Sequence, residues 1–270
     1  MNKISKITIE LAKDGDAHAL ETLVRGIQSN VYRLAIRMLA DPDAAQDATQ
    51  EILIRIVTKL STFHGDSTFE TWTYRVATNY LLTAKKVIAT DPGLSFQMFS
   101  DDLLNGLADE SRAAPEYHIM LNELRIKCTM AMLLCLDRNH RAAYVLGEIL
   151  DFDHTEAASI LDVSPANFRK QLSRARISVH DFTAATCGLA DQSADCSCRK
   201  RLPAAIAQGR ISGSPIAELI DAPTFTQVQD EATKLEAELV AAKLQHATGP
   251  LIPRKDFADA VLKIVAPPNR

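Results

Sequence analysis

Apolar side chains recur at three- and four-residue steps along most of this chain, a spacing that predicts amphipathic helices. The first predicted helix carries its apolar stripe at Leu20, Leu23, Val24, Ile27, Val31, Leu34, Ala35 and Met38. An Asp-Pro-Asp sequence at 41–43 interrupts this pattern and supplies a capping carboxylate for a second helix, whose stripe runs over 52–60. After a loop over 61–67, a third helix is predicted over about 68–87.

The pattern changes after this third helix. Residues 90–115 begin with Asp-Pro-Gly and continue as an acidic, serine-containing stretch, a composition typical of a flexible linker. Helical periodicity resumes over 116–150, with a pause at 137–139, and a compact unit follows over 153–183. Further on, one longer helix is predicted near 225–246, with an apolar seam at Val228, Ala232, Leu235, Leu239 and Ala242.

These patterns predict an all-α protein in which a flexible linker joins two small helical domains and a mostly helical extension follows. The predicted boundaries are 1–89 for the first domain, 90–115 for the linker, 116–183 for the second domain and 184–270 for the extension. Composition agrees with this fold class. Hydrophobic residues make up 47% of the 270 positions, enough for packed cores, while aromatic residues at 6% favour helices over sheets.

Charge and cysteine content exclude some classes of protein. The net charge of −4 argues mildly against nucleic-acid binding, but the local field depends on where the charges lie. The N-terminus lacks the apolar core of a signal peptide and no apolar run approaches a membrane span, so we expect a cytoplasmic protein without membrane insertion. Five cysteines, an odd number, argue against a disulfide framework.

The strongest local motif is a helix–turn–helix pattern at 154–176, HTEAASILDVSPANFRKQLSRAR. Asp162 falls at the tight turn, where a left-handed backbone is needed and Asp is better tolerated than most residues. Ser164 is placed to cap the second helix, and Pro165 occupies its first position, where no amide hydrogen bond is lost. Phe168 and Leu172 are expected on the buried face.

The opposite face of this second helix is basic, with no acidic residue between Ser164 and Asp181. A helix in the major groove presents its N-terminal residues, here Ala166, Asn167 and Lys170, to base edges, and its later arginines to phosphates. An ordinary solvated basic helix would show the same pattern. The motif alone therefore indicates DNA binding and no more.

Two runs in the first domain resemble a known family. The run over 43–63, DAAQDATQEILIRIVTKLSTF, resembles the second conserved region of sigma-70-type factors, and HGDSTFETWTYRVATN at 64–79 resembles the promoter-melting segment that follows it. The helix–turn–helix resembles the family's fourth region. Together with the connection between them, the two regions resemble the extracytoplasmic-function (group IV) sigma factors over roughly 16–183.

This resemblance implies a sigma factor that binds core RNA polymerase, directs promoter-specific transcription initiation and catalyses no reaction. The polymerase-binding residues implied are Asp47, Gln50, Glu51 and Arg55. The residues implied for recognising and melting the minus-10 element, within 62–86, are Phe63, His64, Asp66, Ser67, Phe69, Trp72, Arg75, Asn79, Lys85 and Lys86. Those implied for the minus-35 element are Ser164, Ala166, Asn167, Arg169, Lys170, Ser173, Arg174 and Arg176. The single tryptophan fits a core position as well as a DNA-facing one.

The chain departs from the family pattern in three places. Leu136-Asp137 stands where the family has a Leu-Pro pair, Asp162 replaces the glycine of the turn, and the basic cluster after Asn79 is modest. These departures put the promoter preference in doubt more than the binding of polymerase.

The extension contains a group of cysteines next to a basic turn at 199–201. Cys187, Cys196 and Cys198 could hold zinc with a fourth ligand such as His180, act as a thiol sensor, or be incidental, whereas Cys128 and Cys135 fit a helical core. The spacing lacks the paired C-x₂-C arrangement of a strong zinc site, so no metal or cofactor is predicted. We hypothesise that the extension regulates the factor.

The main alternative is a stand-alone helix–turn–helix regulator that does not bind core polymerase, since such a protein would not need the 43–79 segment. Phosphate loops, nucleophile–base pairs and convincing metal-ligand sets are not recognisable in the sequence, so we expect no enzymatic activity. The expected partners are core RNA polymerase and promoter DNA, and the sequence leaves open whether an anti-sigma factor also binds.

Overall fold

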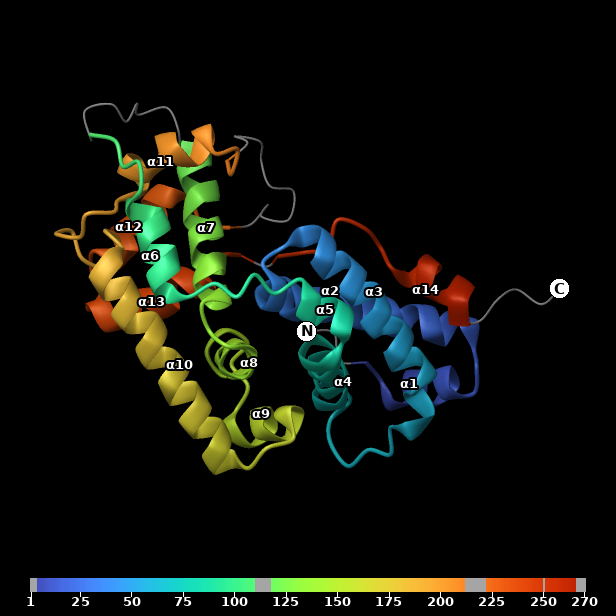
Figure 1. Ribbon diagram of the computed structural model, residues 1–270. Helices are drawn as coiled ribbons and strands as arrows, with labels where there is room; N and C mark the ends of the chain where they lie inside the picture. Colours follow the sequence, from blue (N-terminus) through green and yellow to red (C-terminus); the bar gives the residue numbers. More distant parts are fainter. Residues whose placement is uncertain (1–3, 110–117, 212–221, 250, 266–270) are drawn as a thin grey trace. The chain divides into compact units, whose positions relative to one another are not determined.

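The computed structural model describes residues 4–109, 118–211, 222–249 and 251–265 (Figure 1). This described part is helical and contains no β-sheet, which confirms the predicted all-α class; one isolated bridge joins Cys187 and Cys196. The elements in chain order are α1 (Lys6–Lys13), α2 (Ala17–Leu39), α3 (Pro42–Thr58), the 3₁₀ turn η1 (Leu60–Thr62), α4 (Phe69–Thr83), α5 (Lys85–Ala89), α6 (Phe96–Leu104), α7 (His118–Leu134), α8 (Arg138–Tyr144), the π-helical turn η3 (Val145–Ile149), α9 (His154–Leu161), α10 (Pro165–Thr186), α11 (Cys198–Ala207), α12 (Phe225–Ala232), α13 (Ala237–His246) and α14 (Ala258–Val265).

The chain folds into two compact units and passes between them several times. The first unit comprises residues 1–90, 152–168 and 251–270, and the second comprises residues 91–151 and 169–250. The helix–turn–helix segment and the extension are thus each divided between the units. The four functional segments expected from the sequence group the residues differently, and their boundaries stay a prediction.

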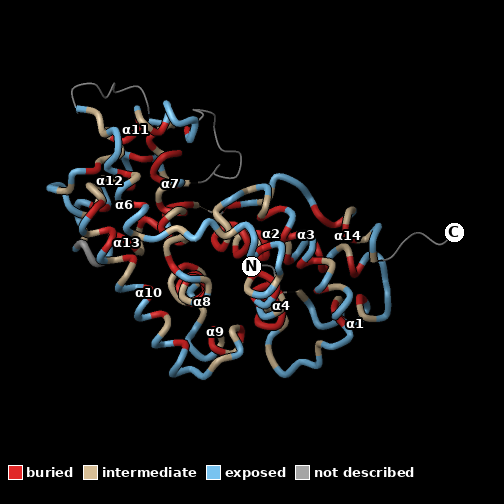
Figure 2. Tube along the Cα trace, viewed as in Figure 1, coloured by how far each residue is buried: buried red, intermediate tan, exposed pale blue. Residues whose placement is uncertain are grey.

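In the first unit, α2, α3 and α4 enclose an apolar core (Figure 2). The predicted stripe of α2 is buried throughout, and Leu23, Val24, Ile52 and Leu53 are fully inaccessible to solvent. The carboxylate of Asp41 accepts a hydrogen bond from the Ala44 amide at 2.8 Å, so the expected cap of α3 is present.

The second unit is built on α7, against which α6, α11, α12 and α13 pack. A buried arginine on α7 holds two distant segments. Arg125 donates to the carbonyl oxygen of Pro223 at 3.3 Å and to that of Ala247 at 3.0 Å. Because a buried guanidinium needs acceptors, these bonds fix the end of α13 to the middle of the unit.

The segment expected to be a flexible linker contains a packed helix, so that expectation differs from the structure over residues 90–109. Phe99 and Leu103 of α6 are buried, and the ring of Phe99 stacks on that of Phe182 with centroids 5.4 Å apart. Arg201 of α11 donates to the carbonyl oxygen of Asn105 at 2.7 Å. Apolar residues at helical spacing inside the acidic stretch explain the difference. Residues 110–115 lie outside the described part.

The longer helix expected over 225–246 is two helices, α12 and α13, separated by residues 233–236. Val228 and Ala232 are buried as expected, but Leu239 is 55% exposed, and Val240 and Leu244 are buried instead. Leu235 is half-buried and packs against the same cluster as Val228 and Ala232, so the predicted seam is wrong at Leu239, where the second helix turns a different side to the core.

Candidate nucleic-acid interface

The helix–turn–helix segment has the local geometry that its sequence predicts. The carboxylate of Asp153 caps α9, accepting from the Thr155 amide at 2.7 Å. Asp162 then adopts the left-handed conformation, with φ of 55° and ψ of 45°, and ends the helix. The Ser164 hydroxyl accepts from the Asn167 amide at 3.2 Å at the start of α10, and Phe168 is fully buried.

The expected minus-35 residues form an exposed face on α10. Each of them is solvent-exposed: Ser164, Ala166, Asn167, Arg169, Lys170, Ser173, Arg174 and Arg176. One of these cations already has a partner, because the Arg176 guanidinium pairs with the carboxylate of Glu148. The remaining basic groups leave α10 with the positive potential that a phosphate backbone requires.

Three aromatic rings gather where the loop after η1 joins α4. The centroid of Phe63 lies 5.3 Å from that of Phe69 and 5.6 Å from that of Trp72, and Phe69 and Trp72 stack at 5.8 Å. Trp72 is only 9% exposed, so its ring packs against the other two and offers little surface on which a base could stack. The ammonium of Lys13 lies 5.5 Å from the Phe63 ring, a cation–π distance.

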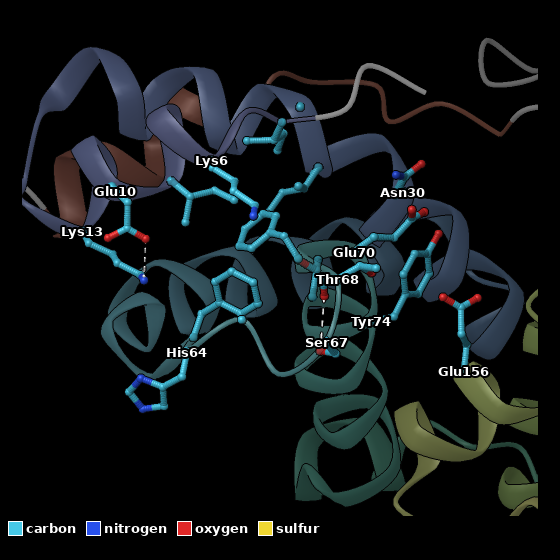
Figure 3. Close-up of a pocket in the computed structure, with 18 of the residues that line it drawn as sticks. Lys6, Glu10, Lys13, Asn30, His64, Ser67, Thr68, Glu70, Tyr74 and Glu156 are labelled. Carbon is cyan, nitrogen blue, oxygen red and sulfur yellow. Dashed lines mark hydrogen bonds and ion pairs between the residues drawn. The ribbon is translucent and has the colours of Figure 1, made fainter.

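Beside this aromatic cluster, the first unit contains a pocket of about 570 Å³ (Figure 3). Helices α1, α2 and α4 and the loop before α4 line it, together with Phe152 and with Glu156 of α9. Of the expected minus-10 residues, Phe63, His64, Ser67 and Phe69 lie at this pocket. Figure 3 shows the His64 imidazole at the margin, turned away from the other lining side chains.

Both signs of charge line the pocket. Lys6 and Lys13 come from α1, and Lys13 pairs with Glu10 at 2.9 Å. On the other side, burial raises the pKa of Glu70, and burial together with the nearby Asp153 raises the pKa of Glu156. Aromatic walls with ammonium and carboxyl groups at the edge can hold a flat heteroaromatic ring and exchange hydrogen bonds with its rim.

The other expected minus-10 residues lie outside the pocket. Asp66, Asn79, Lys85 and Lys86 are exposed, but none of them lines it. Arg75 is exposed and engaged within the first unit, where its Nε donates to the carbonyl oxygen of Ser159 at 3.0 Å. The expected set is therefore split between the pocket, the loop before α4, the buried Trp72 and the exposed side of α4 and α5.

Sequence reasoning missed the contribution of the N-terminal helix to this pocket. Lys6, Lys13 and Asn30, and Tyr74 on α4, line it without having been expected. Lys6 and Lys13 are seven residues apart and so share one face of α1, a signal that could have been noticed. Tyr74 is buried and its ring meets that of Phe152 edge-on, with centroids 4.8 Å apart.

The residues expected to bind polymerase lie along α3. Asp47, Glu51 and Arg55 are exposed at four-residue steps, which places them on one side of the helix, and Gln50 is half-buried beside them. The Arg55 guanidinium lies 4.9 Å from the Tyr80 ring, and the Lys86 ammonium lies 3.2 Å from the Asp47 carboxylate.

The cysteines of the second unit belong to its apolar clusters or pack against them. Within the described residues, His, Cys, Asp and Glu side chains form no group of three that could hold a metal. His180, the candidate fourth ligand, contacts Asp181 at 3.2 Å. Burial raises the pKa of Cys128 to about 12 and that of Cys196 to about 11. In the same described part, each helix is too short or too polar to cross a lipid bilayer.

Two family models match the chain. The model described as Sigma-70 region 2 matches residues 23–86, and the model described as Sigma-70, region 4 matches residues 126–179. The first contains the exposed row of α3 and the aromatic loop, and the second contains the helix–turn–helix segment. Residues 180–270 lie outside both models.

Characterised sigma factors resemble the chain over the same part. The ECF RNA polymerase sigma-E factor of Escherichia coli K12 is 29% identical over 176 residues, which cover 63% of this chain and 90% of that protein. The RNA polymerase sigma-H factor of Pseudomonas aeruginosa is 27% identical over 173 residues, covering 62% and 88%. A solved structure of the sigma factor RpoE with the anti-sigma factor NepR, from Bartonella quintana, aligns with a TM-score of 0.38 at 16% identity, covering 64% of this chain and 96% of that one.

The two matched regions, in this order on an all-helical scaffold, define a transcription factor of the sigma type that directs RNA polymerase to promoters. The chain thus resembles sigma-70 family proteins over both regions, and the relatives it resembles include extracytoplasmic-function sigma factors.

Proposed function

We propose that this sigma factor reads the minus-35 element with α10 and the minus-10 element with the 62–86 segment, while α3 docks on core polymerase. The observation that carries the proposal is the exposed face of α10, on which the whole expected minus-35 set is accessible in a net-acidic chain. A solvated basic helix in an unrelated protein would not be preceded by a segment that resembles sigma-70 region 2, as α10 is here.

For the minus-35 element, the capped start of α10 supports direct reading of bases. Asn167 and Lys170 are exposed within the first two turns, where a recognition helix meets base edges. Asn can bond bidentately to adenine, and Lys can bond to the acceptors of guanine. Arg169 and Arg174 are exposed as well and are suited to phosphates, which add affinity without sequence information.

For the minus-10 element, the pocket beside the aromatic cluster supports capture of a base that has left the duplex. Its volume of about 570 Å³ accommodates a nucleobase with part of its sugar, and Phe63 and Phe69 offer ring surface. The carboxylates of Glu70 and Glu156 at its edge are suited to accept hydrogen bonds from a base edge. Lys6 and Lys13 supply positive charge for the strand.

For polymerase, the exposed row on α3 supports docking against a charged helical partner. Asp47, Glu51 and Arg55 offer both signs of charge on a helix whose opposite side is anchored in the core. Because α3 is already folded, docking has to order only these side chains, and this lowers the entropic cost of binding.

The experiment that tests the DNA roles is holoenzyme binding to a promoter that full-length protein transcribes, with each base pair of the minus-35 element substituted in turn. We expect Asn167→Ala to lose discrimination at one base pair, by about 1–3 kcal/mol. Lys170→Ala should lose discrimination at a neighbouring base pair if Lys170 contacts a base, and should weaken binding to all sequences alike if it contacts a phosphate. Arg174→Ala should weaken all sequences alike and lower the salt dependence by about one ion.

The matched control is Lys234→Ala, which removes an exposed cation from the extension and should leave promoter affinity unchanged. For the minus-10 element, a 2-aminopurine at each position in turn should brighten on binding where a base is flipped, and Phe69→Ala should suppress that signal. An Asn167→Ala variant that weakens all sequences alike, or that leaves promoter affinity unchanged as Lys234→Ala does, would overturn the assignment of α10 as the reading helix.

A further inference from the structure

The last segment of the chain packs on the first unit rather than on the rest of the extension. Helix α14 lies against both α2 and α3, and Figure 1 shows it beside these helices. Phe257, Ala258 and Val261 are completely buried, and Leu251 is 4% exposed. These side chains form a continuous apolar contact, whereas Ile264 on the same helix is 55% exposed to solvent.

Polar groups fix the register of this contact. The backbone amide of Phe257 donates to Oε1 of Gln28 at 2.8 Å. The Arg25 guanidinium of α2 pairs with Asp256 and lies 3.8 Å from Asp259. Since Arg25, Asp256 and Asp259 are all substantially exposed, salt screens these pairs, and the apolar side chains supply most of the attraction.

The segment also reaches the acidic row of α3. Asp43, Asp47 and Glu51 stand at four-residue steps and share one side of that helix. Arg254 lies 3.6 Å from Asp43, at the first position of the row. A helix with its side chains is about 10 Å across, so α14 on α3 narrows the surface on which a partner helix can dock.

We propose that residues 251–265 occupy, within the same molecule, part of the α2–α3 surface that core polymerase needs, so that polymerase must displace them to bind. The proposal rests on the proposed docking role of α3. Arg254 offers a positive charge to the acidic row, as a basic helix of polymerase would. The same segment also covers apolar surface of α2 and α3. The extension thus lowers the affinity for polymerase until its last segment is released.

The size of the effect follows from the docked fraction. When only molecules with a released segment can bind, the apparent dissociation constant rises by the reciprocal of the released fraction. A segment docked nine-tenths of the time weakens binding about tenfold. Full-length variants that release the segment should therefore bind polymerase about tenfold more tightly than the parent protein.

The test compares full-length Arg25→Glu and Phe257→Ala proteins with the parent in binding labelled core RNA polymerase. Arg25→Glu places a carboxylate against Asp256 and Asp259, and Phe257→Ala removes the largest buried side chain of the segment. Ile264→Ala is the matched control, because it shortens an exposed side chain of the same helix. Amide hydrogen exchange over 251–265 reports release, and circular dichroism reports whether the helices of the first unit persist.

We expect faster exchange over 251–265 and about tenfold tighter polymerase binding for both releasing variants, with Ile264→Ala unchanged. Combining Arg25→Glu with Asp256→Arg and Asp259→Arg should restore both slow exchange and weaker binding. Release without any gain in affinity, or with a loss, would overturn the proposal, since the segment would then be neutral or part of the docking surface. If no form binds polymerase, the proposed docking role of α3 fails and this inference fails with it.

Discussion

The ammonium of Lys86 lies 3.2 Å from Oδ2 of Asp47, so one ion pair connects a residue expected to contact minus-10 DNA with a residue expected to contact polymerase. The side chains are 71% and 62% exposed, and a pair so open to water contributes at most about 1 kcal/mol to folding. Both groups therefore remain available to external partners.

This pairing leads to a first prediction, about Asp47→Ala and Lys86→Ala. Each variant should change the free energy of unfolding by less than about 1 kcal/mol, because the pair is solvated. Asp47→Ala should weaken polymerase binding, and Lys86→Ala should weaken promoter binding by the holoenzyme and reduce its salt dependence. Urea unfolding, polymerase titration and promoter titration at several salt concentrations measure the three quantities. Equal loss of polymerase affinity in both variants would contradict the assignment of Lys86 to DNA.

The turn of the helix–turn–helix gives a second prediction. Asp162 holds φ at 55°, a conformation that costs an L-residue roughly 1 kcal/mol and glycine almost nothing. Asp162→Gly should therefore raise the thermal unfolding midpoint by a few degrees, and Asp162→Ala should lower it. Calorimetry of the two variants measures the shifts. A lower midpoint for Asp162→Gly would mean that the carboxylate itself stabilises the turn.

A third prediction concerns the pH dependence of stability in the second unit. The Arg210 guanidinium donates to Oδ1 of Asp102 at 2.9 Å, and the hydrogen bond from Arg210 lowers the pKa of Asp102 below its ordinary value of 3.8. Arg201, which is 2% exposed, donates to the same carboxylate at 3.2 Å. Because the folded state favours the ionised carboxylate, this stabilisation is present above about pH 4 and is lost as the pH falls through the folded pKa.

Asp102→Asn should accordingly lower the free energy of unfolding by about 1.5–3 kcal/mol at pH 7, the range for hydrogen bonds to a charged group. The difference from the parent protein should shrink steadily below pH 4. Urea unfolding between pH 2.5 and pH 7 measures both effects. A difference that is constant with pH would show that the charge of Asp102 does not contribute.

The cysteines give a fourth prediction. Burial raises the pKa of Cys128 and Cys135 to about 12, and that of Cys196 to about 11, so almost no thiolate is present at pH 8. Since the thiolate is the reactive form, iodoacetamide should modify these three cysteines at least about 100-fold more slowly in the folded protein than in urea. Mass spectrometry of quenched samples measures each site. Rapid modification of Cys196 in the folded protein would instead support a thiol sensor.

The sequence predicted best what neighbouring residues determine. Helix periodicity, the cap at Asp41, the left-handed turn at Asp162 and the burial of Phe168 depend on side chains within a few positions. The all-α class followed from the same local signals. The roles of the site residues came from the family resemblance, and they stay predictions.

What the sequence did not predict depends on contacts between distant positions. Arg201 and Asp102 are 99 residues apart, and their pairing helps to hold α6 inside what was expected to be a linker. Phe257 and Gln28 are 229 residues apart, and no local pattern indicates that the last segment lies on α2. The same holds for Lys6 and Lys13, whose place at the pocket requires the packing of α1 beside the loop before α4.

The measurement that tests the account most directly is in vitro transcription with core RNA polymerase on the DNA upstream of the protein's own gene, using the full-length protein. The account predicts transcripts from one defined start site that are absent without the protein and are abolished by substituting the minus-10 or minus-35 element. Failure to bind core polymerase, with DNA binding retained, would contradict it and would indicate a stand-alone helix–turn–helix regulator.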